Sequence, residues 1–139
     1  LSISELLDGY RSGRFTPVDV ARAGLSLAGK VSELNCFTEL NEDRIISHAQ
    51  ALTETIKSDG SARLFGVPVG IKDLICTKGV RTTAASKMLR EYVPPYDATV
   101  IRHLSAARSI SFGKLNMDEF AMGSSNENSA FGNVLNPWD

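Results

Sequence analysis

Apolar residues in the first part of the chain recur at the three- to four-residue spacing of amphipathic helices. A first helix is predicted over residues 2–12, because serines near its start can act as N-caps and Gly13 can end it. A second helix is predicted to begin at Thr16 and Pro17, which suit an N-cap and the first helical position. Its apolar stripe continues to about Leu34.

A third helix is predicted after Asn41, whose side chain can cap it. A polar break at residues 57–60 ends this helix, and its apolar stripe is Ile45, Ala49, Leu52 and Ile56. Residues 36–40 predict a short strand between the second and third helices. Residues 1–60 are therefore interpreted as a mainly helical region.

The pattern changes to the two-residue alternation of a strand at residues 66–73. One face of this strand would carry the β-branched residues Val67, Val69 and Ile71. The other face would carry Pro68, Gly70 and Lys72. That second face is small up to the lysine, which leaves room for another segment of backbone to approach.

A further helix is predicted over residues 97–107, with Asp97 as its N-cap, and a second strand over residues 109–113. The expected buried side of this helix is Val100, Ile101 and Leu104. The succession of strand, helix and strand predicts a β-α-β unit with a parallel sheet, and so an α/β fold class. Neither a Gly-x-Gly-x-x-Gly nor a Walker-type loop accompanies the unit, so no nucleotide site is indicated.

The composition is that of a globular protein of one domain, with 139 residues, 42% apolar and 22% charged. No apolar run approaches the length of a membrane span, and no membrane association is predicted. The chain has 15 basic and 16 acidic residues, so it lacks the excess positive charge with which proteins bind nucleic acid. No basic segment leads into an apolar targeting region, and the start at Leu1 without Met suggests that a segment was trimmed or was never included.

Cys36 and Cys76 lie far apart without a nearby Cys or His to complete a zinc site. They are predicted to be two reduced, buried thiols. His48 and His103 lie on predicted helices without a motif around them, and lone helical histidines are more often surface or structural residues than catalytic ones. The sequence therefore predicts no metal site and no histidine-dependent triad.

Lys72 is the candidate for catalytic chemistry. If the end of its strand is buried, the loss of water disfavours the ammonium form and leaves a free amine that can act as a base. The alternative is a solvated lysine at the end of an edge strand, where its charge opposes aggregation. Both interpretations fit the strand pattern.

Two polar stretches are further candidates. Residues 76–86 are rich in small and hydroxyl side chains, which suit a loop that folds over a site and equally an ordinary connection. Residues 113–132 carry a run of Ser, Asn and Glu after a Met-Gly turn. This run offers the donors and acceptors that a small polar amide needs, and it equally suits a solvated loop.

Four stretches of the chain closely resemble the amidase signature family, namely residues 66–73, 94–100, 113–132 and 136–139. The resemblance covers nearly the whole chain, being general over the first sixty residues and strong afterwards. Residues 118–125 most resemble the A subunits of tRNA-dependent amidotransferases within that family.

The resemblance implies a large α/β fold, a mixed sheet wrapped by helices, that hydrolyses amides with a Ser–cis-Ser–Lys triad. Lys72 matches the family's catalytic lysine, which takes a proton through a bridging serine. The residues that match the substrate-binding side, and are candidates for contacting glutamine, are Met122, Gly123, Ser124 and Ser125. No metal ligands are implied.

The resemblance also implies a function, the release of ammonia from glutamine for conversion of Glu-tRNA(Gln) or Asp-tRNA(Asn) to the amidated form. Partner subunits of the B and C types are implied, with ATP, Mg²⁺ and most tRNA contacts at a partner rather than in this segment. The expected compartment is the cytoplasm, or an organelle matrix or stroma. The alternatives are a stand-alone amidase of another small amide and a catalytically dead fragment with an assembly role.

Against the family pattern, residues 1–139 are a partial domain, in which 61–139 begin the catalytic core. In the family, a Gly/Ser-rich stretch with the bridging serine, and then the nucleophile, follow the motif at 136–139. The chain alone is therefore expected to be inactive. Two residues depart from the pattern. Leu74 stands where Asn is frequent, and Arg108 where Gly is usual; Arg108 suits the helix dipole but can crowd a tight turn.

Overall fold

A mixed three-stranded sheet forms the centre of the computed structural model, which describes residues 1–56 and 61–138. The strands are β1 (Phe37–Glu39), β2 (Pro68–Lys72) and β3 (Ile110–Leu115). β3 is central, antiparallel to β1 and parallel to β2. The predicted α/β class with a mixed sheet is confirmed, while the polar break predicted at 57–60 lies outside the described residues.

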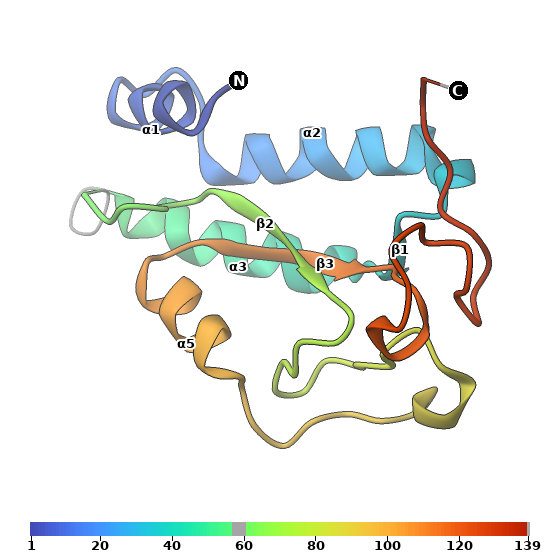
Figure 1. Ribbon diagram of the computed structural model, residues 1–139. Helices are drawn as coiled ribbons and strands as arrows, with labels where there is room; N and C mark the ends of the chain where they lie inside the picture. Colours follow the sequence, from blue (N-terminus) through green and yellow to red (C-terminus); the bar gives the residue numbers. More distant parts are fainter. Residues whose placement is uncertain (57–60, 139) are drawn as a thin grey trace.

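The described helices surround this sheet and account for most of the first sixty residues. They are α1 (Ile3–Arg11), α2 (Pro17–Lys30), α3 (Glu42–Glu54) and α5 (Thr99–Ala106), with 3₁₀ turns η1 (Ser32–Leu34), η2 (Lys87–Leu89) and η3 (Glu119–Ala121). In the view of Figure 1, α1 and α2 lie above the strands and α5 lies below them. None of the helices described is both long and apolar enough to cross a membrane.

Side chains cap the first three helices as the sequence predicts. Ser2 and Thr16 each begin a capping box, in which the cap hydroxyl accepts the N–H three residues on and the acidic side chain there accepts the cap's own N–H. Asn41 caps α3 by accepting the Arg44 N–H at 2.9 Å. These bonds satisfy N–H groups that a helix start otherwise leaves unpaired.

Two predicted helix boundaries are wrong. α2 ends before Leu34, because the chain tightens into η1 and then turns at Asn35, whose backbone is left-handed with a φ of 53°. Asp97 does not cap α5, because its carboxylate accepts the Lys78 N–H at 2.7 Å. Ala98 occupies the N-cap position instead.

β2, α5 and β3 form the predicted β-α-β unit, since β2 and β3 are parallel. On α5, Ile101 is buried and Leu104 is half-buried. Val100 is 46% exposed, so the prediction that it is buried is wrong. Because neighbouring helical residues point about 100° apart, the burial of Ile101 leaves Val100 at the margin of the packed face.

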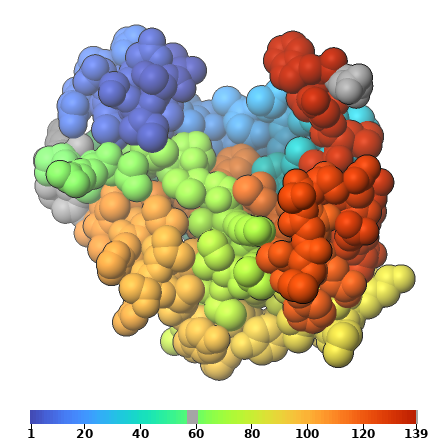
Figure 2. All heavy atoms as spheres, viewed as in Figure 1, coloured from blue at the N-terminus to red at the C-terminus, as the bar shows by residue number. Residues whose placement is uncertain are grey.

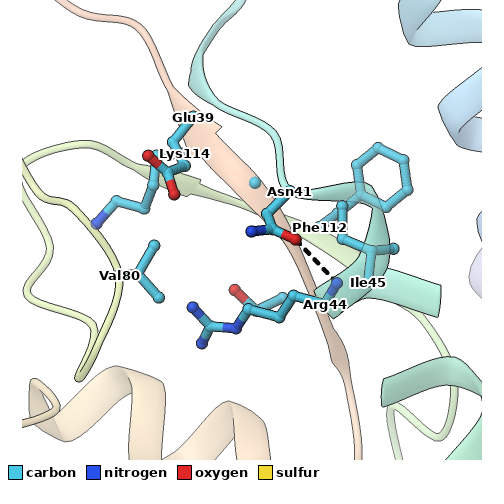
Figure 3. A pocket seen from close by; sticks show the side chains of 9 residues that line it. Glu39, Asn41, Arg44, Ile45, Val80, Phe112 and Lys114 are labelled. Carbon is cyan, nitrogen blue, oxygen red and sulfur yellow. Dashed lines mark hydrogen bonds between the residues drawn. The ribbon is translucent and has the colours of Figure 1, made fainter. Parts of the chain in front are cut away.

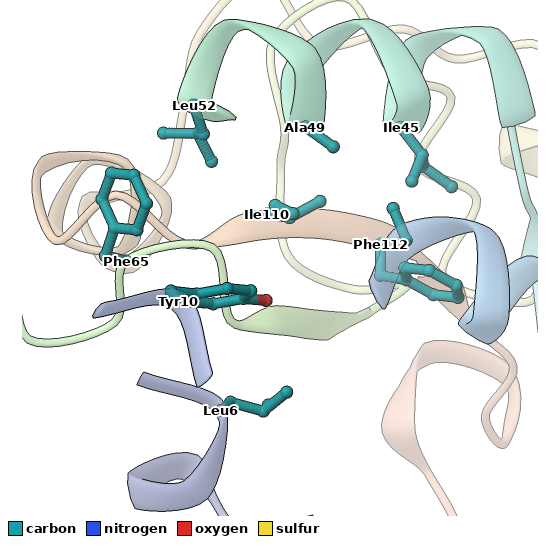
Figure 4. Close-up of a cluster of buried hydrophobic side chains, with 9 residues drawn as sticks. Leu6, Tyr10, Ile45, Ala49, Leu52, Phe65, Ile110 and Phe112 are labelled. Atoms are coloured by element: carbon teal, nitrogen blue, oxygen red, sulfur yellow. The ribbon is translucent and has the colours of Figure 1, made fainter. Parts of the chain in front are cut away.

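The core lies between α3 and β3 and extends to α1 and α2. Figure 4 shows the stripe predicted on α3, Ile45, Ala49 and Leu52, directed at Ile110 and Phe112 of β3. The other buried members are Leu6, Tyr10, Ala21 and Phe65. α2 lies close to β3 at Gly24, where an added Cβ would lie 2.8 Å from the ring of Phe112.

The two cysteines lie outside this core. Cys36 and Cys76 are free thiols, as predicted, but both are half-buried rather than buried. Cys36 directly precedes β1, and Cys76 lies in the loop after β2, so each keeps one side open to solvent. The sequence alone could not place them at the border of the core.

Candidate active site

Lys72 is the last residue of β2, which is an outer strand of the described sheet. The predicted alternation holds in part, since Val67 and Ile71 are buried whereas Gly70 and Lys72 are exposed. Pro68 and Val69 are both half-buried, and the pairing with β3 is irregular between Val69 and Gly70. Of the two interpretations of Lys72, the described part of the chain shows the exposed one. The reason is that β2 has a partner strand on one side only and the small residues before Lys72 give it no cover. Its surroundings here are those of a solvated lysine on an edge strand.

A buried carboxylate follows Lys72 directly. Asp73 is fully buried, and its backbone N–H donates to the carbonyl of Leu115 at 3.0 Å. Its carboxylate accepts two hydrogen bonds from Thr83, one from the backbone N–H at 3.2 Å and a short one from the hydroxyl. These bonds make Asp73 the point at which the end of β2 is tied to β3 and to the loop that follows.

A buried lysine faces that carboxylate from β3. The side chain of Lys114 is 1% exposed, and its Nζ lies 3.9 Å from an Asp73 oxygen. The same Nζ donates to the Thr82 hydroxyl at 2.9 Å and makes a short bond to the carbonyl of Ile75. Burial lowers the pKa of the Lys114 amine, and the negative charge of Asp73 opposes that shift.

Residues 82–86 form a buried platform next to the pair. The Ala84 N–H donates to the carbonyl of Asp73 at 3.0 Å, and Ala84 and Ala85 both have left-handed backbones, with φ of 50° and 53°. This turn directs the two alanine carbonyls outward, where they accept the N–H groups of Phe120 at 2.9 Å and Ala130 at 3.0 Å. The stretch 76–86 is thus part of the interior as well as a connection.

The predicted substrate-binding residues lie on the segment that this platform holds. Met122 is 85% exposed, and Gly123, Ser124 and Ser125 are exposed as well. Figure 2 shows this orange-red segment beside the green residues that follow β2, on one face of the molecule. A chain of backbone hydrogen bonds, from Asp73 to Ala84 to Phe120, connects it to the residue after Lys72.

Asp118 fixes the shape of the segment. Its carboxylate accepts the N–H groups of Asn128 at 2.9 Å and Asn126 at 3.0 Å, and these bonds lower its pKa. A Cβ at Gly123 would lie 2.5 Å from the carboxyl carbon of Asp118. Gly123 is therefore required by the close approach of this carboxylate, whatever its role toward a substrate.

Asn116 closes the other end of the segment. Its amide donates to the carbonyls of Asn35 and Gly132, each at 3.1 Å, and its side-chain oxygen accepts the Ser129 hydroxyl at 2.6 Å. The exposed residues 122–125 thus lie between Asp118 and the stretch 126–132, which the side chains of Asp118 and Asn116 hold by hydrogen bonds.

Two cavities border the sheet and are not lined by residues 122–125. A cavity of about 20 Å³ beside Arg44 (Figure 3) is lined from β1, α3 and β3, and has room for about one water. A second, of about 150 Å³, lies between α3, the sheet and α5, with His48 at its wall. Burial, with the charges of Arg44 and Arg108, lowers the pKa of the His48 imidazole. Within residues 1–56 and 61–138, no His, Cys, Asp and Glu side chains group to hold a metal ion.

The sequence reasoning missed Lys114, Asp73 and Asp118. A signal for Lys114 was present, because it continues the alternation of Ile110 and Phe112, and the burial of β3 alternates through all three. The predicted strand stopped at residue 113, one position short of it. Asp73 and Asp118 carry no such signal, since their partners are loop N–H groups that only the fold brings near.

Most of the chain matches a known protein family. Residues 20–139 match a protein-family model described as Amidase. The chain is 46% identical over 138 residues to the A subunit of glutamyl-tRNA(Gln) amidotransferase from Zymomonas mobilis, a match that covers 99% of this chain and 28% of the relative. The chain thus spans less than one third of the length of this curated relative.

Solved structures share the arrangement. A crystal structure described as an amidase superposes with a TM-score of 0.88 at 32% identity, covering 100% of this chain and 32% of the other. The native peptide amidase of Stenotrophomonas maltophilia superposes with a TM-score of 0.89 at 25% identity, covering 99% of this chain and 30% of the other. The described helices and sheet are therefore found within larger amidase folds.

Proposed function

The chain belongs to the amidase family, and from that premise we propose that it is the N-terminal part of the glutamine-hydrolysing subunit of a tRNA-dependent amidotransferase. The observation that carries the proposal is the 46% identity to the A subunit of a glutamyl-tRNA(Gln) amidotransferase along almost the whole chain. The identities to the two solved amidases compared above are lower, at 32% and 25%. In the proposed reaction, ammonia released from glutamine passes to a partner that amidates Glu-tRNA(Gln) or Asp-tRNA(Asn).

In this proposal Lys72 is the base of a Ser–cis-Ser–Lys triad. The bridging serine and the nucleophilic serine belong to a longer protein that contains this chain. Lys72 takes a proton from the bridging serine, which in turn activates the nucleophile for attack on the glutamine amide. A base of this kind must be a neutral amine. Since Lys72 is exposed here, we propose that other parts of that longer protein cover it and exclude water.

The proposed substrate contacts come from Met122, Gly123, Ser124 and Ser125. Their exposure lets the two serine hydroxyls meet a polar amide, while the Met122 N–H donates to the carbonyl of Glu119 at 3.1 Å. Asp118 and the carbonyls of Ala84 and Ala85 hold the backbone around them, so that little ordering is needed when a ligand binds.

Partners carry the other half of the proposed reaction. We propose B- and C-type subunits as partners, with ATP, Mg²⁺ and most tRNA contacts in one of them. The near balance of 15 basic and 16 acidic residues supports this division, because the chain lacks the positive charge that tRNA binding requires.

The first test is the substitution Lys72→Ala in the full-length protein that contains this chain. Loss of a catalytic base is expected to lower kcat for ammonia release from glutamine by about 10²- to 10⁴-fold. The protein is expected to remain folded, as judged by a cooperative thermal transition, because β2 is held by its backbone pairing with β3 and not by the Lys72 side chain. Lys87→Ala, at an exposed lysine of η2, is the matched control and is expected to keep wild-type kcat. A Lys72→Ala protein with wild-type kcat would show that the assignment is wrong.

A stand-alone amidase is the second candidate function, favoured by the superposition on solved amidases that are not described as subunits. The two functions differ in their response to partners. Ammonia release that rises when B- and C-type subunits and the aminoacyl-tRNA are added supports the amidotransferase. Hydrolysis indifferent to these additions, and faster on another small amide than on glutamine, supports the stand-alone amidase.

A further inference from the structure

We propose that the buried pair of Asp73 and Lys114 positions Lys72 relative to the substrate-side segment 119–130. The inference rests on the function proposed above, because it gives the pair a role in placing that function's base. It assigns to the pair no contact with the substrate and no proton transfer, so both residues are positioning residues.

Lys72 needs other residues to fix its position, because its own side chain is exposed on an outer strand of the described sheet. Its place is set through the backbone, where the Lys72 carbonyl accepts the Ile75 N–H at 2.9 Å and the next residue bonds to Leu115. Both bonds belong to the turn that leaves β2. Whatever fixes this turn therefore fixes the direction in which the lysine leaves the sheet.

Lys114 lies directly beneath that turn. Its Nζ donates hydrogen bonds to the Ile75 carbonyl and to the hydroxyls of Thr82, at 2.9 Å, and Thr77, at 3.5 Å, which use the three donors of an ammonium group. The Asp73 carboxylate lies 3.9 Å from the same Nζ and forms an ion pair with it. One amine thus joins the start of the turn, its middle and the platform at residues 82–86. A buried charge that is fully paired in this way holds its partners tightly, since moving any of them leaves a polar group unsatisfied.

The register of the sheet keeps Lys114 away from the proposed reaction. Ile71 pairs with Lys114 and Lys72 pairs with Leu115, so Lys114 shares the buried face with Ile71 and Lys72 lies on the opposite face. Lys114 can therefore act on Lys72 only through Asp73 and the turn. This is why the geometry points to positioning and not to a second base.

The same pair reaches the substrate side. Asp73 binds Thr83 by its side chain and Ala84 by its carbonyl, and the carbonyls of Ala84 and Ala85 bind Phe120 and Ala130. The left-handed turn at these two alanines depends on the Thr83 bonds that precede it. Loss of the pair is therefore expected to loosen both Lys72 and segment 119–130.

The test compares Lys114→Met, Asp73→Asn and the double variant in the full-length protein that contains this chain. Each single variant leaves one buried charge without its opposite charge. We expect kcat for ammonia release to fall about 10- to 100-fold, with a severalfold rise in KM for glutamine. The double variant removes both charges, so its melting temperature is expected to recover while kcat stays low. Recovery of kcat together with the melting temperature would show a merely structural role and overturn the proposal.

A second readout does not depend on catalysis. Hydrogen exchange at the Phe120 and Ala130 amides is expected to speed up in Lys114→Met, because their acceptors belong to the platform that Lys114 holds. Leu52→Ala, a core truncation far along α3, is the matched control that lowers stability with kcat per folded molecule unchanged. Unchanged exchange at both amides, with wild-type kcat and KM, would overturn the proposal.

If Lys114→Met does not fold, the variant Thr82→Val tests the proposal instead. It removes one acceptor of the Lys114 amine without leaving a buried charge unpaired, and a severalfold fall in kcat is expected. Wild-type kcat and KM in Thr82→Val would overturn the proposal in that case. Lys72→Ala is measured in parallel. If it stays active, the proposed function fails; if it is inactive while Lys114→Met keeps wild-type kinetics, this inference alone fails.

Discussion

Arg108 has a left-handed backbone, with a φ of 62°, directly after the end of α5. This is the position at which a helix most often ends in glycine, because a Cβ makes the conformation unfavourable by about 1–2 kcal/mol. The backbone at this position thus favours the glycine that the family resemblance implies. The carbonyl of Arg108 accepts the Gly66 N–H at 2.8 Å, so the turn is also tied to the start of β2.

Arg108→Gly is therefore expected to stabilise the protein. Relief of the left-handed strain is partly offset by the greater freedom of glycine in the unfolded chain, which leaves a gain of about 0.5–1 kcal/mol. Thermal unfolding measures it as a higher melting temperature. Ala106→Gly, two residues earlier and inside α5, is the control and is expected to lose about 1 kcal/mol. A loss of stability in Arg108→Gly would contradict the assignment of strain.

The carboxylate of Asp118 is expected to make the stability of the folded protein depend on pH. Its pKa is lowered in the folded protein by the N–H groups of Asn128 and Asn126, so the folded state favours the charged form. The stabilisation is fully present above the ordinary aspartate value of about 3.9 and is lost as the pH falls through the lower folded value. We expect Asp118→Asn to be less stable than wild type at pH 7, with the difference shrinking below about pH 4. Denaturant unfolding at several pH values measures this, and a difference that does not change with pH would exclude the carboxylate as its cause.

At the scale of elements, two glycines of α2 separate packing from helix propensity. A Cβ at Gly24 would meet the ring of Phe112 at 2.8 Å, whereas nothing lies within 4 Å of one at Gly29. Gly24→Ala is expected to lose about 1 kcal/mol, because the overpacking of the core exceeds the gain in propensity. Gly29→Ala is expected to gain roughly 0.5–1 kcal/mol. Chemical denaturation of both proteins gives the comparison, and equal effects would show that α2 does not approach β3 as described.

The elements show how far local sequence carries the fold. Helix starts at Ser2, Thr16 and Asn41 were predictable, because each cap bonds to an N–H within three residues of itself. The cap predicted at Asp97 was wrong, because that carboxylate is used by the Lys78 N–H, nineteen positions away in sequence. Bonds between distant segments compete with local ones, and sequence patterns describe only the local ones.

The candidate site divides in the same way. The strand that carries Lys72 and its alternation were predictable, since they depend on two-residue spacing alone. Whether Lys72 is covered depends on what packs against β2, which the sequence pattern left open, and in the described part of the chain it is exposed. The buried partner Lys114 was missed because the predicted strand was too short, and the roles of Met122 and its neighbours stay predictions.

At the scale of the whole molecule, apolar side chains remain on the surface. Trp138 is 92% exposed, Met88 and Met122 are each 85% exposed, and β2 is an outer strand of the described sheet. Large exposed apolar side chains and an open strand edge favour association. We expect residues 1–139 expressed alone to self-associate at micromolar concentration, measured by sedimentation velocity. Met88→Lys is expected to reduce the association and Lys87→Ala to leave it unchanged. A monodisperse, cooperatively melting sample would contradict this expectation.

The central place of β3 has a consequence for synthesis on the ribosome. β1 and β2 leave the ribosome first, yet each pairs with β3 and not with the other, and Lys72 meets Leu115 only roughly 40 residues later. At about 5–20 residues per second, β2 waits several seconds without a hydrogen-bonding partner. During that interval the locally capped helices can form, whereas the sheet cannot, so a nascent chain paused between β2 and β3 is the species most in need of a chaperone.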